Sequence, residues 1–203
     1  MNKIAGLLLA AGASTRMGKP KQLLRAGGVS LLDRVLEQTL NSELNRVILV
    51  LGFKAQEIAQ ALKTDRHHPK LKIIENRDYA DGISSSIIAG LSAVEKDHDH
   101  VMIILADMPH ISSKLIDRLL HEYLESHSPL GGVKVKDRRS HPVVISRRFY
   151  PDLHRLRGDT GARHLFLKHP DQICLVEPEE GYEDTDIDTM EDYLGFIKSI
   201  EEP

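Results

Sequence analysis

Short aliphatic runs alternate along the chain with longer stretches in which apolar residues recur every three or four positions. A short, nearly continuous apolar run is typical of a strand that is covered on both faces of a sheet. On this basis we expect strands at residues 4–9, 46–51, 71–75, 101–106, 131–135, 142–146 and 172–176.

The stretches between these runs have the periodicity of amphipathic helices. Leu32, Val35, Leu36 and Leu40 fall on one helical face, and Ser30 precedes them as a suitable N-cap. We therefore expect helices at residues 30–40, 55–62, 84–94, 112–125 and 190–200.

This alternation predicts an α/β fold with three layers, in which a mainly parallel, Rossmann-like sheet carries helices on both faces. The pattern becomes irregular after Leu130, where residues 136–141 separate two expected strands and suggest a hairpin or a lid. No linker, repeat or low-complexity segment divides the sequence, so we expect one domain spanning residues 1–203.

Composition narrows the classes of function. The formal net charge is −3, which argues against general binding to nucleic-acid backbones, because such binding needs a basic face. No apolar stretch approaches the length of a transmembrane helix, so we expect no membrane partner. The one cysteine, Cys174, cannot form an internal disulfide, which favours a cytoplasmic protein.

The segment after the first expected strand is suited to a polyanion. Small residues allow close approach to the backbone, and consecutive amide groups can form an anion-binding nest. Arg16 and Lys21 add positive charge, and we expect Lys21 to be an exposed loop lysine. A triphosphate fits this chemistry, although a plain glycine-rich turn is the alternative. The segment is not a Walker A loop, because five residues separate Gly12 from Gly18 and Pro20 replaces the magnesium-binding Ser or Thr.

Carboxylates occur at two places that could hold Mg²⁺. Asp107 follows the fourth expected strand, and Asp184, Asp186 and Asp188 alternate near the C-terminus, where an extended segment would project them to one side. The simpler alternatives are that Asp107 only starts a turn and that Asp188 or Thr189 caps the last helix.

Two further loops carry weaker signals. Residues 82–86 open a helix and offer free amide groups and hydroxyls, so Ser84 is a candidate nucleotide contact, although a serine N-cap is the simpler explanation. Residues 158–163 form a turn that leads into a helix.

Together these segments resemble the molybdenum cofactor nucleotidyltransferases, and most closely their molybdopterin cytidylyltransferase branch. The likeness begins at residues 9–23 and continues at residues 82–86, 106–109, 158–163 and 186–192. It implies a MobA-like NTP transferase domain with a nucleotide-diphospho-sugar transferase-like fold. It also implies a magnesium-dependent transfer of CMP from CTP to a molybdopterin-type acceptor, with release of pyrophosphate.

The resemblance also implies a role for each matching residue. Arg139 and His141 correspond to an acceptor element in which Ser140 replaces a usual glycine, and Met190 replaces a frequent proline. The implied assignments are nucleotide binding by Ala10, Ala11, Gly12, Ala13, Ser14, Arg16 and Lys21, catalysis by Arg16, Lys21 and Asp107, metal binding by Asp107 and Asp188, and acceptor binding by Arg139 and His141.

Two other functions remain open at this point. The chain could be a guanylyltransferase or a nucleotidyltransferase for a sugar or polyol phosphate. It could also be a maturation factor that delivers the cofactor to an apo-molybdenum hydroxylase with little or no transfer activity. Intact Lys21, Asp107 and Asp188 favour the enzyme.

Overall fold

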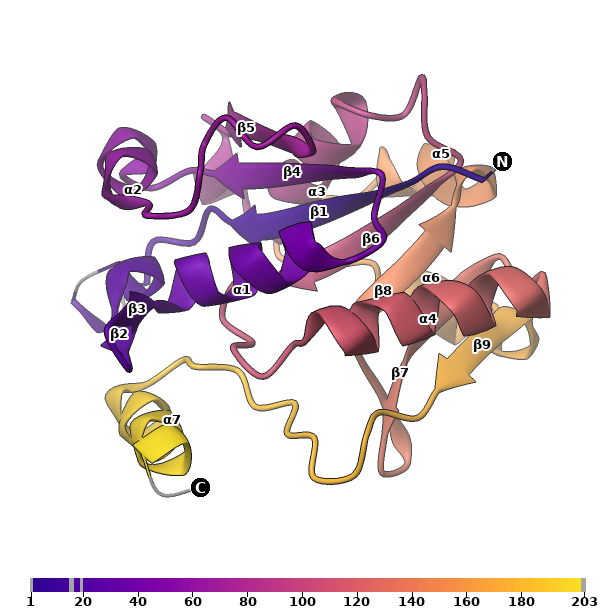
Figure 1. The fold of residues 1–203 in the computed structure, drawn as a ribbon. Helices are drawn as coiled ribbons and strands as arrows, with labels where there is room; N and C mark the ends of the chain where they lie inside the picture. The colour runs from indigo at the N-terminus through magenta and orange to yellow at the C-terminus, as the bar shows by residue number, and fades with distance from the viewer. Residues whose placement is uncertain (1, 15–16, 19, 202–203) are drawn as a thin grey trace.

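The computed structural model describes residues 2–14, 17–18 and 20–201. Within these residues, seven strands form one sheet in the order β5-β4-β1-β6-β8-β7-β9, and a short hairpin lies apart from it (Figure 1). Strand β8 is antiparallel to both neighbours, and the other pairs are parallel. The sheet strands are β1 (Ile4–Ala10), β4 (Arg46–Leu51), β5 (Leu71–Glu75), β6 (His100–Leu105), β7 (Leu130–Val135), β8 (Arg138–Ser146) and β9 (Ile173–Val176), and the hairpin pairs β2 (Arg25–Ala26) with β3 (Val29–Ser30).

Helices cover both faces of this sheet (Figure 1). Because successive side chains of a strand point to opposite faces, the apolar run of β1 serves two cores. Its Ile4 and Leu8 pack with helices on one face, and its Ala5 and Leu7 pack with helices on the other. The first face carries α1 (Leu31–Asn41), α2 (Ala55–Ala61) and α4 (Ser113–Ser126), and the second carries α3 (Ile83–Ser92), α5 (Tyr150–Leu153) and α6 (Arg163–Lys168).

Two serines fix where the long helices begin. The Ser30 hydroxyl accepts a hydrogen bond from the backbone N–H of Asp33 at the start of α1, and Ser112 does the same for Leu115 at the start of α4. Both are N-caps of the kind that the sequence indicates. The expected strands are all present, and every one except the sixth lies within one residue of its expected bounds.

The connection between β7 and β8 corrects one expectation. Residues 136–141 were expected to join the two strands as a hairpin loop or a lid, but β8 already begins at Arg138, so the turn consists of residues 136–137. The hairpin itself is confirmed, with Val135 paired to Arg138. Arg139 and His141 therefore belong to a sheet strand, which holds them more rigidly than a lid would.

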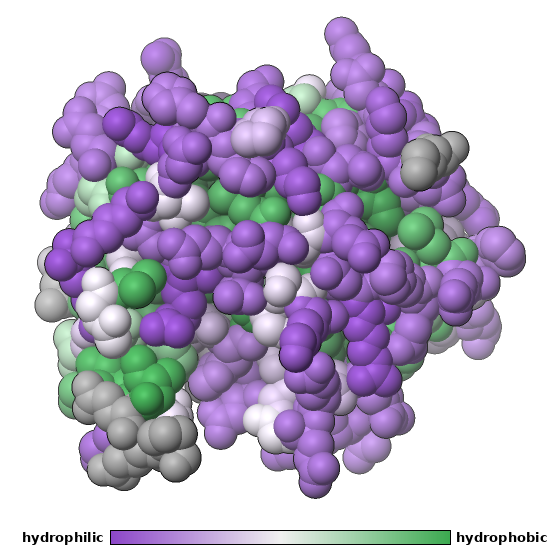
Figure 2. Space-filling view, viewed as in Figure 1, coloured by the Kyte–Doolittle hydropathy of each residue, from purple (hydrophilic) through white to green (hydrophobic). Residues whose placement is uncertain are grey.

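The last helix, α7 (Met190–Glu201), packs beside the β2–β3 hairpin. Its Phe196 lies in an apolar cluster with Leu24, Leu31 and Ile187. In Figure 2 this region is the apolar patch at the lower left of an otherwise mainly hydrophilic face. The Ile187 N–H donates to the backbone oxygen of Asp107 at 2.9 Å, so the segment before α7 is attached to the end of β6.

The topology determines where a ligand can bind. From β1 the chain passes to β4 and β5 on one side, and later to β6 on the other side of β1. Ligands of such sheets bind where the strand order reverses, outside the carboxyl ends of the strands. The described residues include no helix that is long and apolar enough to span a bilayer.

Candidate functional site

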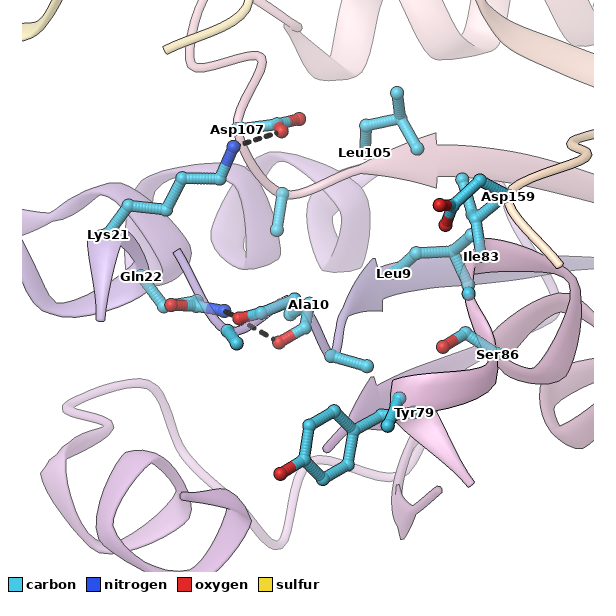
Figure 3. A pocket seen from close by; sticks show the side chains of 16 residues that line it. Leu9, Ala10, Lys21, Gln22, Tyr79, Ile83, Ser86, Leu105, Asp107 and Asp159 are labelled. Atoms are coloured by element: carbon cyan, nitrogen blue, oxygen red, sulfur yellow. Dashed lines mark hydrogen bonds and ion pairs between the residues drawn. The ribbon is translucent and has the colours of Figure 1, made fainter. Parts of the chain in front are cut away.

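A cavity of about 470 Å³ opens at the carboxyl ends of β1 and β6, where the strand order reverses (Figure 3). The loop after β1 and Lys21 form one wall, and the start of α3 forms the other. The lining residues are Leu9, Ala10, Ala11, Gly12, Ala13, Lys21, Gln22, Tyr79, Ala80, Gly82, Ile83, Ser86, Leu105, Ala106, Asp107 and Asp159. The backbone predicted to hold a nucleotide thus borders this cavity, apart from Ser14.

The shape of the loop depends on Gln22, to which no role was assigned from the sequence pattern. The Gln22 side chain is 3% exposed, and its Nε2 donates hydrogen bonds to the backbone oxygens of Ala10 and Gly12, each at 2.9 Å. The Ser14 hydroxyl accepts a hydrogen bond from the Lys21 N–H at 3.1 Å. These bonds tie the two ends of the loop together, so its amide groups are held in place before a ligand binds.

We expect Gln22→Ala to distort this loop. Removing the amide leaves the buried Ala10 carbonyl without its donor, which should lower the free energy of unfolding by about 2 kcal/mol. Nucleotide affinity should fall as well, because the loop amides lose their fixed arrangement. Urea unfolding and nucleotide titration measure the two effects. Gln56→Ala on the exposed face of α2 is the matched control and should change stability by less than about 0.5 kcal/mol.

Lys21 connects the two acidic segments. Its ammonium lies 2.6 Å from Asp107 Oδ2 and 2.9 Å from Asp188 Oδ1, although Asp188 is 167 positions away in the chain. The Lys21 side chain is only 17% exposed, so the expectation of an exposed loop lysine was wrong. Burial favours the neutral amine, but the two carboxylates outweigh burial and raise the pKa of Lys21. Lys21 is therefore a charged, partly buried ammonium.

The same region has the features of a divalent cation site. The two carboxylate oxygens that contact Lys21 are no farther apart than the sum of those two contact distances, which is short enough for one ion to reach both after a small adjustment. Asp107 Oδ1 is buried and has no hydrogen-bond partner among the described residues. Within the same residues no group of three or more His, Cys, Asp or Glu side chains is arranged to hold a metal. Two carboxylates are nevertheless enough for Mg²⁺, which usually completes its shell with substrate phosphates and water.

The three alternating aspartates have different partners. Asp188 contacts Lys21, whereas Asp184 accepts a hydrogen bond from Arg138 at 2.9 Å. Burial, followed by the charges of Asp107 and Asp188, raises the pKa of Asp186 to about 6. The neighbouring carboxylates make ionisation of Asp186 less favourable, so this region holds more negative charge than its surroundings neutralise. A bound divalent cation would neutralise it.

The opposite wall of the cavity is the start of α3. Gly82 has a φ of 93°, which favours glycine, and a Cβ there would lie 2.4 Å from the carbonyl carbon of Gly158. Ser84 is 3% exposed, its N–H donates to the Gly158 oxygen, and it does not line the cavity. Ser86 lines it instead and accepts a hydrogen bond from Asn76 at 3.0 Å. Ser86 is itself only 4% exposed, so the difference between the two serines is that Ser86 borders the cavity and Ser84 does not.

A second cavity, of about 510 Å³, contains the residues predicted to bind the acceptor. Arg139 and His141 line it together with Arg138, Arg163 and Asp186. His141 Nδ1 lies 3.4 Å from the backbone oxygen of Ile103. Burial lowers the pKa of His141 to about 4, so the imidazole is neutral at pH 7. A proton on Nδ1 leaves Nε2 as a hydrogen-bond acceptor.

The structure thus places Lys21 and Asp107 at one cavity, brings Asp188 into contact with Lys21, and places Arg139 and His141 at the other cavity. Arg16, predicted to bind the outer phosphates, lies outside the described residues. Asp159 also lines the first cavity, whereas in the sequence it stands out only as part of the 158–163 turn. The roles assigned to these side chains remain predictions.

The model of the MobA-like NTP transferase domain matches residues 6–173 of the chain. The chain belongs to the MobA-like NTP transferase family. It is therefore an enzyme of a nucleotidyltransferase family, with a nucleoside triphosphate as the implied substrate.

Similar proteins in this family have different names. The chain is 31% identical to nicotine blue oxidoreductase of Paenarthrobacter nicotinovorans over 196 residues, which cover 93% of each chain. It is 26% identical to molybdenum cofactor cytidylyltransferase of Escherichia coli over 199 residues, which cover 96% of this chain and 95% of the relative. MobA-like membership therefore leaves the acceptor open.

A solved relative shows the same fold. The structure of Rv0371c from Mycobacterium tuberculosis in complex with manganese matches with a TM-score of 0.80 at 25% identity, covering 98% of this chain and all of that one. This likeness confirms the mainly parallel sheet with helices on both faces.

Proposed function

We propose that this chain transfers CMP from CTP to the terminal phosphate of molybdopterin or molybdenum cofactor, releases pyrophosphate, and so serves the maturation of a molybdenum hydroxylase. The observation that carries the proposal is the Lys21 ammonium held between Asp107 and Asp188 beside a cavity of nucleotide size. A basic cavity shares this corner of the molecule and suits a phosphorylated acceptor. The E. coli cytidylyltransferase, similar over nearly its whole length, supports the choice of CTP and of the acceptor.

The arrangement suits an in-line displacement. The loop of Ala10, Ala11, Gly12 and Ala13 holds the triphosphate, and an oxygen of the acceptor phosphate attacks the α-phosphorus. The bond between the α-phosphorus and the bridging oxygen breaks, and pyrophosphate leaves with the electron pair. Mg²⁺, when bound, neutralises phosphate charge. If Asp107 and Asp188 bind a cation instead of Lys21, the Lys21 ammonium can donate hydrogen bonds to the phosphates. Catalysis is then positioning and charge stabilisation without a covalent protein intermediate.

One screen tests both the choice of nucleoside triphosphate and the type of reaction. The purified chain is incubated with Mg²⁺, molybdenum cofactor and CTP, GTP, ATP or UTP in turn, and pyrophosphate release is measured. We expect release with CTP that depends on the acceptor and on Mg²⁺. Faster release with GTP would instead support a guanylyltransferase, and release with a sugar phosphate in place of the cofactor would support a sugar-phosphate nucleotidyltransferase.

Two outcomes would overturn nucleotidyl transfer itself. Binding of molybdenum cofactor without pyrophosphate release from any triphosphate would point to a delivery factor. Oxidoreductase activity, again without pyrophosphate release, would match the name of the 31% identical relative. Lys21, Asp107 and Asp188 argue against both outcomes, because neither function needs a lysine and two carboxylates beside a triphosphate-sized cavity.

We expect His141→Ala to weaken the use of the acceptor while leaving CTP binding nearly unchanged. The neutral imidazole offers an acceptor nitrogen that can bind an N–H group of a pterin, and its loss should raise the acceptor KM by about 10-fold. Initial rates at varied acceptor and varied CTP measure the two constants. His67→Ala, an exposed histidine away from both cavities, is the control. An equal rise in both KM values would contradict this assignment.

A further inference from the structure

Two arginines in the second cavity have no carboxylate partner. Among the described residues, neither the Arg139 nor the Arg163 guanidinium is within ion-pair distance of an Asp or Glu, whereas nearby Arg138 is paired with Asp184. Burial and then the charge of Arg163 lower the pKa of Arg139, which shows that the two cations lie near each other. Arg163 is exposed and Arg139 is partly buried, so both guanidinium groups are available to an anion that enters this cavity.

Arg139 is also held in place before any ligand arrives. Its guanidinium lies over the Phe166 ring at 4.0 Å from the ring centroid. On the neighbouring strand β7, a Cβ at position 132 would lie 2.9 Å from the Arg139 Cγ, so Gly132 leaves the space through which the side chain passes. A guanidinium fixed in this way loses little entropy when it binds a phosphate through two parallel hydrogen bonds.

The pair is located between the two cavities already described. A smaller cavity of about 70 Å³ is lined by Arg139, Arg163 and His141, which also line the acceptor cavity, and by Ile83, which also lines the nucleotide cavity. An anion held by the pair would therefore lie on the side of the acceptor cavity that adjoins the nucleotide.

The rest of the acceptor cavity indicates what is attached to the anion. Leu167 is 70% exposed and Leu175 is 44% exposed, and both line the cavity beside Ile173. Exposed large apolar side chains beside a charged site are typical of a ligand-binding surface. Of the two carboxylates that line this cavity, Asp184 is paired with Arg138 and Asp186 belongs electrostatically to the Asp107–Asp188 group. The ligand that fits is a phosphate monoester with an apolar or ring-shaped body.

We propose that Arg139 and Arg163 together clamp the phosphate monoester of the acceptor and present its oxygen to the α-phosphorus of the nucleotide. This rests on the proposed transfer function and adds Arg163, together with the class of acceptor. A phosphate dianion attacks through its own oxygen, the α-phosphorus releases pyrophosphate with the electron pair, and no proton has to be removed. The clamp therefore orients the nucleophile and needs no general base.

Binding of phenyl phosphate tests the clamp without relying on turnover. The titration is done calorimetrically with the whole chain in Mg²⁺, with the nucleotide cavity filled by a CTP analogue that has a methylene group between the α- and β-phosphorus. We expect Arg163→Gln and Arg139→Gln each to weaken phenyl phosphate binding by about 10- to 100-fold, because each loses a charge-assisted bidentate contact. Affinity for the CTP analogue should change by less than about twofold.

Three controls keep the result specific. Arg155→Gln removes the same charge from an exposed site that lines neither cavity, and its binding should match the parent. Arg139→Lys keeps the charge but loses the planar fork and should resemble Arg139→Gln. Arg163 is exposed, so Arg163→Gln should melt like the parent even if Arg139→Gln does not.

Unchanged phenyl phosphate binding in a folded Arg163→Gln protein would overturn the clamp, as would an equal loss in Arg155→Gln. The proposed function fails in a different way. If the variants lose phenyl phosphate binding but the parent transfers no CMP to molybdenum cofactor, the clamp stands and the acceptor assignment falls.

Discussion

Lys21→Ala is expected to lower turnover with CTP and molybdenum cofactor by about 100- to 1,000-fold, the usual loss when one oriented charged donor is removed from a reacting group. The structure gives the reason that the ammonium matters: it is partly buried, charged, and in contact with both Asp107 and Asp188. KM for CTP should change much less than turnover, because Lys21 acts where charge shifts as pyrophosphate leaves.

The variant should still fold. Without Lys21 the two carboxylates repel each other, so Lys21→Ala should melt slightly below the parent without Mg²⁺ and regain part of the difference when Mg²⁺ is added. Lys114→Ala, on the exposed face of α4, is the matched control and should behave as the parent does in both assays. A Lys21→Ala protein with nearly parental turnover would show that the loop chemistry is assigned to the wrong residue.

Asp107→Asn is expected to cause a loss of similar or greater size, about 1,000-fold in kcat/KM, because a metal that neutralises phosphate charge contributes several kcal/mol to the transition state. The Asp107 carboxylate contacts Lys21 through one oxygen and has its other oxygen buried without a partner in the described residues. Asparagine keeps the shape of the side chain and removes its negative charge, so the fall in kcat/KM measures the contribution of that charge. Manganese affinity, measured by electron paramagnetic resonance, should fall in parallel.

Asp186→Asn provides the comparison for this prediction. Asp186 stands two residues before Asp188 and still carries most of its negative charge at pH 7, because burial raises its pKa only to about 6. Lys21 pairs with Asp107 and Asp188, and no ion pair joins it to Asp186 among the described residues. We expect a much smaller loss of metal binding and of rate than in Asp107→Asn. A loss in Asp186→Asn as large as that in Asp107→Asn would show that the cation is held by a different pair of carboxylates.

Much of the fold could be predicted because one physical signal determines it. Strands such as β4 and β6 are nearly continuous apolar runs, and a strand buried on both faces leaves no other pattern. The meeting of Lys21 with Asp107 also follows from topology, since β1 and β6 are neighbours and parallel. Their loops must then lie at the same edge of the sheet.

Other features depend on contacts between distant segments, which a sequence pattern does not contain. Gln22 is buried because the loop folds back over it, yet glutamine is a usual surface residue. Ser84 and Ser86 are both nearly buried, but only Ser86 borders the cavity, and this difference depends on where α3 begins. The polar residues at the start of β8 looked like a loop because one side of that strand borders the acceptor cavity.

The most direct test of the account is to follow the α-phosphorus of CTP. The parent chain is incubated with Mg²⁺, molybdenum cofactor and CTP labelled at the α-phosphorus, and products are separated by chromatography. We expect the label to move onto the cofactor in equal amount to the unlabelled pyrophosphate released, and Lys21→Ala to slow both. Label that stays in CTP, or that appears as free CMP with no labelled cofactor, would contradict transfer to this acceptor.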